Sequence, residues 1–70
     1  MDVSRLVTMV NDIAAFFQGE ADEAGAGARV ADHLKRFWAP AMRAQLVSYF
    51  RSGGEGLSPV AQNAVRLLAS

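Results

Sequence analysis

The sequence contains no cysteine and only one histidine. Without cysteine the chain can form neither disulfides nor thiolate metal sites. His33 has no second ligand one helical turn away, so we expect no metal site in this chain. The absence of cysteine also agrees with a cytoplasmic location.

Excess charge and long apolar runs are also missing. Seven basic and seven acidic residues give a formal net charge of zero. Nucleic-acid-binding proteins usually carry a basic excess, so a nucleic-acid partner is not expected. No apolar stretch approaches the roughly 18 residues that would suggest a membrane span. The N-terminus shows no signal-peptide pattern, and a membrane partner is not expected either.

The 70 residues are 51% hydrophobic, which is typical of a folded chain. We expect one helical domain over residues 1–70. A domain of this size buries only about 60% of its unfolded surface, so its stability is marginal without help. With disulfides and metals set aside, self-association or a larger partner is the expected source of further stability.

Hydrophobic residues recur at helical spacing, and no segment alternates as a strand does. The pattern predicts an all-α fold, a small bundle of three to four short helices. Caps, prolines and glycines place these helices at about residues 2–18, 28–38, 40–51 and 59–69. We expect loops at Gly19–Gly27 and Gly53–Gly56. The glycine tether predicts that the last helix is the least firmly docked.

The apolar arc of the first predicted helix is unusually wide. Leu6, Val10 and Ile13 share its centre, and Met9 and Phe16 widen one flank. The arc covers about 180°, whereas an ordinary surface helix shows roughly 100°. We therefore expect one flank to face the core and the Met9–Phe16 flank to be available to a partner.

Residues 33–43 concentrate large aromatic and cationic side chains at a joint between two predicted helices. We expect this segment to be the chief contact with a partner. Its candidate contact residues are His33, Arg36, Phe37, Trp38, Pro40, Met42 and Arg43. Core packing is the alternative for the two aromatic residues, and for His33 the alternative is a boundary residue bonded to backbone or carboxylate. Tryptophan and arginine are enriched at interface hot spots.

The sequence shows no assembled catalytic set. Nothing pairs a particular serine with His33, and the glycines match no phosphate-binding loop because no strand precedes them. We expect no catalytic residues and no independent enzymatic activity. The basic residues Arg29, Lys35, Arg36 and Arg43 leave nucleic-acid binding as an alternative.

Two segments carry a family resemblance. Asn11–Phe17 reads NDIAAFF, and Val30–Arg43 reads VADHLKRFWAPAMR. Together they resemble the delta subunit of soluble NAD-dependent formate dehydrogenase, in which His, Phe-Trp, Pro and Met-Arg follow in this order. The resemblance covers roughly residues 5–46.

The resemblance implies a non-catalytic accessory subunit in the cytoplasm. Its partners would be the catalytic subunit, which holds a molybdenum or tungsten pterin, and the electron-transfer subunits with iron–sulfur clusters, FMN and NAD. No cofactor is expected in this chain. Its role would be to support assembly, stability or maturation of the catalytic subunit. The alternative is a self-associating helical adaptor or regulatory domain, which forms a homo-oligomer when isolated.

Overall fold

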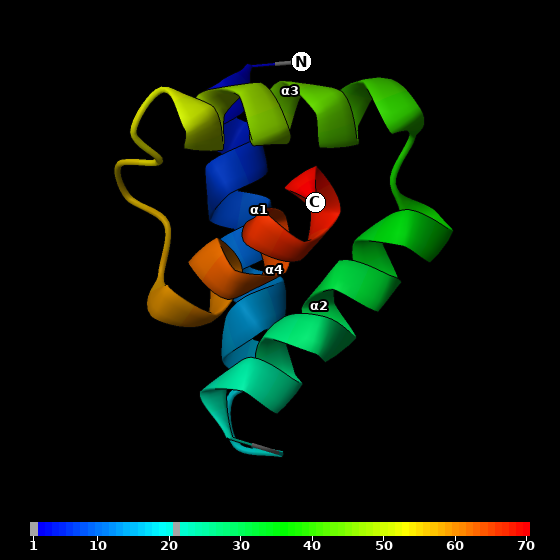
Figure 1. Ribbon diagram of the computed structural model, residues 1–70, viewed down its shortest axis with the longest axis vertical. Coiled ribbons are helices and arrows are strands. Elements are labelled where there is room, and N and C mark those ends of the chain that lie inside the picture. Colours follow the sequence, from blue (N-terminus) through cyan, green and yellow to red (C-terminus); the bar gives the residue numbers. More distant parts are fainter. Residues whose placement is uncertain (1, 21) are drawn as a thin grey trace.

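Four helices make up the part of the chain that the computed structural model describes, residues 2–20 and 22–70. They are α1 (Val3–Phe17), α2 (Glu23–Phe37), α3 (Pro40–Arg51) and α4 (Pro59–Ala69). No strand occurs within these residues, which confirms the predicted all-α class. In Figure 1, α3 lies across one end of the bundle, while α4 lies near its centre.

Polar caps and prolines define where three of the helices begin. The Asp2 carboxylate accepts a hydrogen bond from the Ser4 backbone N–H at 3.1 Å and another from the Ser4 hydroxyl at 2.9 Å. The Ser58 hydroxyl oxygen accepts from a backbone N–H in the first turn of α4. Pro40 and Pro59 are the first residues of α3 and α4, where a missing N–H costs nothing.

Helix α2 is longer than the sequence pattern indicates. The expected loop at Gly19–Gly27 and the expected helix at 28–38 are both corrected, because α2 begins at Glu23 and ends at Phe37. The Asp22 carboxylate caps its start by accepting from the Gly25 N–H at 2.8 Å. Gly27 is buried against α4, so tertiary packing offsets the poor helix propensity of the glycines.

Helix α4 is the centre of the bundle rather than its loosest part. It contacts all three other helices and packs most extensively against α2. Its buried residues are Val60, Ala61, Ala64 and Val65. The expectation that this helix is the least firmly docked is therefore wrong, because small buried side chains let its neighbours approach closely on several sides.

The connection between α3 and α4 is fastened to the bundle. The Asn11 side-chain amide of α1 donates to the Gly56 carbonyl at 2.8 Å, and its oxygen accepts from the Ser58 N–H at 3.0 Å. Gly54 adopts a φ of 65° and its N–H donates to the Tyr49 carbonyl, which closes the end of α3. The glycines between α3 and α4 therefore form specific turns and do not merely lengthen the connection.

Candidate interaction surface

Trp38 lies in the core rather than on a contact surface. It follows the last residue of α2 in an extended conformation and is only 7% exposed. This corrects the expectation that Trp38 supplies an apolar anchor for a partner. Met42 and Met9, also expected at the contact, are half-buried and pack against the core cluster. Flexible thioether side chains adapt well to such positions at the edge of a core.

Arg43 has an internal role at the joint between α2 and α3. Its Nη1 donates to the backbone carbonyls of Leu34, Lys35 and Trp38, at 3.3, 2.9 and 3.1 Å. The Lys35 and Trp38 carbonyls lie at the end of α2, where intrahelical partners are missing, whereas the Leu34 carbonyl also accepts from the Trp38 N–H at 3.0 Å. The guanidinium therefore caps α2 and sets its angle to α3, together with the exposed Pro40 at the start of α3.

Arg36 is solvent-exposed and forms an ion pair with Asp32 one turn earlier, at 3.0 Å. Arg29 forms a looser pair with Glu20 at 3.7 Å. Exposed pairs of this kind contribute little to stability, about 0–1 kcal/mol. They do matter for the surface charge, because each leaves its arginine locally neutralised.

Two large apolar side chains remain exposed on the same side of the molecule. Phe16 of α1 and Phe37 of α2 are each 73% exposed. Phe17 and His33 join them into one row, with ring centroids 5.1 Å apart for Phe16–Phe17, 6.4 Å for Phe17–His33 and 4.8 Å for His33–Phe37. We call Phe16, Phe17, His33 and Phe37 the aromatic surface. Contiguous exposed apolar groups of this kind are typical of interaction sites.

A shallow hollow of about 320 Å³ lies within the aromatic surface. Its lining is almost entirely apolar and comes from Ile13, Phe16, Phe17 and His33, with Asp12 as the single charged residue. Asp12 and Phe17 are not among the contact residues expected from the sequence; for Asp12 the sequence does carry a signal. Its position one helical turn before Phe16 is the signal that could have placed it beside that ring.

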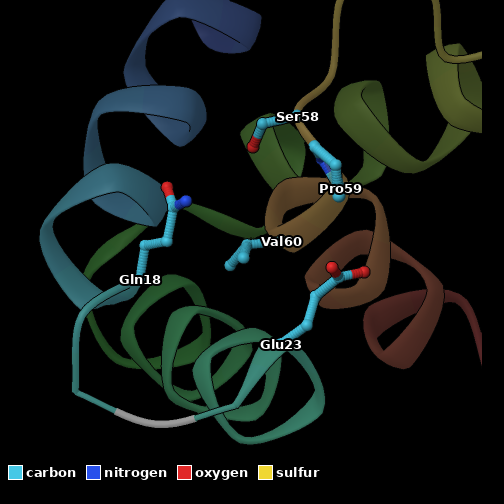
Figure 2. Close-up of a pocket in the computed structure, with 5 residues that line it drawn as sticks. All are labelled: Gln18, Glu23, Ser58, Pro59 and Val60. Atoms are coloured by element: carbon cyan, nitrogen blue, oxygen red, sulfur yellow. The ribbon is translucent and has the colours of Figure 1, made fainter.

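A second hollow, of about 260 Å³, lies where the end of α1 and the starts of α2 and α4 meet. Figure 2 shows its lining residues Gln18, Glu23, Ser58, Pro59 and Val60. Glu23 accepts a hydrogen bond from the Asn63 side chain at 3.4 Å, and the Ser58 hydroxyl caps α4. Glu23 thus links α2 to α4 while Ser58 stabilises the first turn of α4, and the lining offers no nucleophile paired with a base.

A family model for the NADH-dependent formate dehydrogenase delta subunit, FdsD, matches residues 5–65. The chain belongs to this family. No curated protein and no solved structure matches it.

The match to the delta subunit family extends past the segments that carry the resemblance in the sequence. It runs from α1 through α2 and α3 into α4, and so includes the whole aromatic surface and the Arg43 cap. Within residues 2–20 and 22–70, no three metal-ligating side chains come together. No helix of the described chain is long and apolar enough to cross a membrane.

Proposed function

We propose that this chain is a non-catalytic accessory subunit of a cytoplasmic NAD-dependent formate dehydrogenase complex. It docks onto the other subunits through the aromatic surface and supports assembly, stability or maturation of the catalytic subunit. The molybdenum or tungsten pterin, the iron–sulfur clusters, FMN and NAD belong to those partner subunits. Family membership supports the complex, and the geometry supports the docking surface.

The observation that carries the docking role is the exposure of Phe16 and Phe37 side by side with His33. Fully burying one phenylalanine ring contributes about 1.5–3 kcal/mol. A chain of 70 residues leaves two such rings in water although its core is already filled by other side chains. A partner that covers both rings removes this cost, and Phe16 and Phe37 then act as its apolar anchors.

The test uses a complex produced without its delta subunit and a tagged copy of this chain. We expect the wild-type chain to bind the complex, and the F16A/F37A variant to bind at least about tenfold more weakly. Leu67→Ala is the matched control, because Leu67 is also an exposed apolar side chain, 45% exposed, but lies on α4. Circular dichroism checks that all variants keep their helices. Binding of F16A/F37A equal to the wild type would move the interface elsewhere.

Two further measurements separate the roles within the complex. If the chain supports maturation, complexes made without it contain less pterin and metal per catalytic subunit. If it supports stability, complexes made without it keep their pterin content, but their subunits already dissociate at protein concentrations at which the complete complex stays assembled. Unchanged content, unchanged dissociation and unchanged formate-dependent NAD reduction would contradict an accessory role.

Self-association is the second candidate, and the same exposed rings favour it. Two copies could cover each other's Phe16 and Phe37. Sedimentation of the purified chain decides this, because a homo-oligomer dissociates on dilution and the F16A/F37A variant would be monomeric at all concentrations.

A further inference from the structure

The hollow in the aromatic surface combines aromatic walls with one acidic side chain. Phe16 and Phe17 meet nearly at right angles, with ring planes 84° apart, and His33 closes the α2 side. Asp12 also lines the hollow, one turn before Phe16 on α1. Aromatic faces attract cations, and a carboxylate pairs with them, so the two features point to the same class of group.

The charge at this place is uncompensated. The Asp12 carboxylate forms no hydrogen bond or ion pair with any other residue that the structure describes, whereas Asp32 and Glu20 have arginine partners. The arginines closest to His33 along α2, at one turn on either side, are those same partners, Arg29 and Arg36. Arg29 and Arg36 are therefore engaged with other carboxylates and not with Asp12.

A partner that covers the aromatic surface would take Asp12 out of water. Burying an unpaired carboxylate is costly, so the partner must bring a positive group or donors to this position. Arginine fits better than lysine here, because a guanidinium is flat, weakly hydrated and able to stack on an aromatic ring while its N–H groups reach a carboxylate. Its aliphatic stem also suits the apolar lining of the hollow.

We propose that the hollow receives an arginine side chain of the partner subunit, whose guanidinium lies against Phe16 and Phe17 and pairs with the Asp12 carboxylate. This inference rests on the proposed function and identifies the chemistry that the docking surface recognises. An uncharged apolar anchor in the hollow is the competing occupant. It would need the rings but not the carboxylate.

The first test measures binding to the complex that lacks its delta subunit. Asp12→Asn should weaken binding about tenfold and reduce its salt dependence, because it removes the charge that attracts the guanidinium. Glu55→Gln is the matched control, since it removes the same charge from an exposed side chain in the connection between α3 and α4. If D12N binds like the wild type while F16A/F37A does not, the arginine is refuted and the docking surface stands. Failure of the wild type to bind would overturn both proposals.

The second test looks for the arginine itself. Phenylglyoxal modifies arginines, and modified sites are found by mass spectrometry. In the complex with the wild-type chain, one partner arginine should be protected from the reagent, and D12N should restore its modification at matched occupancy. Acetylation of lysines beforehand should leave binding unchanged. Protection of no arginine, or loss of binding on lysine acetylation alone, would refute the proposal.

Discussion

Gly27 is the position where the close approach of α2 and α4 can be tested most directly. A Cβ atom at this position would lie 2.8 Å from the Asn63 Cβ, 3.4 Å from the Ala64 nitrogen and 3.5 Å from the Asn63 carbonyl carbon. The nearest of these atoms is fixed to the α4 backbone and cannot turn away as the end of a flexible side chain could. Gly27→Ala therefore forces α2 and α4 apart.

Two opposing terms set the size of the effect. Alanine is favoured over glycine inside a helix by about 1 kcal/mol. Overpacking a well-filled contact costs about 1–3 kcal/mol, and a clash with atoms near the backbone belongs in the upper part of that range. We expect G27A to lose about 1–2 kcal/mol of unfolding free energy in total. For a domain of this size that lowers the melting temperature by about 5–15 °C.

The measurement is thermal and urea unfolding followed by circular dichroism, with Gly19→Ala as the control. A Cβ at Gly19 meets nothing within 4 Å. G19A should therefore leave stability unchanged or raise it by up to about 1 kcal/mol, through the smaller entropy of the unfolded chain. A G27A variant as stable as the wild type or more stable would refute the close-packing argument, since propensity alone predicts a gain.

Three further substitutions test the contacts that hold the bundle. Asn11→Ala should lower the free energy of unfolding by about 1–2 kcal/mol, because it leaves a backbone N–H and a carbonyl before α4 without partners. Urea unfolding measures this change, and an unchanged free energy would contradict a stabilising role of the two Asn11 hydrogen bonds. Arg43→Met keeps the aliphatic stem but not the cap, and should lower unfolding free energy by about 1–2 kcal/mol in the same assay. The hydroxyl and N–H of Ser4 lower the pKa of Asp2, so the stabilising effect of Asp2 is fully present above its ordinary pKa and is lost as pH falls through the lower folded value. The difference in melting temperature between wild type and Asp2→Ala should accordingly disappear in acid; a difference that persists there would contradict this.

Local signals were enough for the helices whose ends are built from nearby residues. Asp2, Pro40 and Ser58-Pro59 act within one turn, so the starts of α1, α3 and α4 could be read from the chain. The first turn of α2 could not, because its glycines argue for a loop and the packing that offsets them comes from α4, more than 30 residues away. The central position of α4 was missed for the same reason.

Phe16, His33 and Phe37 of the aromatic surface could be predicted as single residues, but Phe17, Asp12 and the surface as a whole could not. The wide apolar arc of the first helix indicates Phe16 as a contact residue. The aromatic and cationic residues of segment 33–43 indicate His33 and Phe37. Whether these groups meet depends on how α1 and α2 pack together, which spacing along one helix does not determine. Only the structure joins the rings into one row and adds Asp12 to the lining of the hollow.

The neighbouring residues Phe37 and Trp38 show how segment 33–43 contributes to both the core and the surface. Phe37 is the last residue of α2 and keeps the helical direction, which leaves its ring beside His33 and in water. At Trp38 the backbone changes to an extended conformation, and its indole enters the core. Arg43 holds this change in place by bonding to the Leu34 carbonyl in the last turn of α2 and to the carbonyl of Trp38 just after it. Residues inside the joint thus decide which of the two neighbouring aromatic rings stays exposed to solvent.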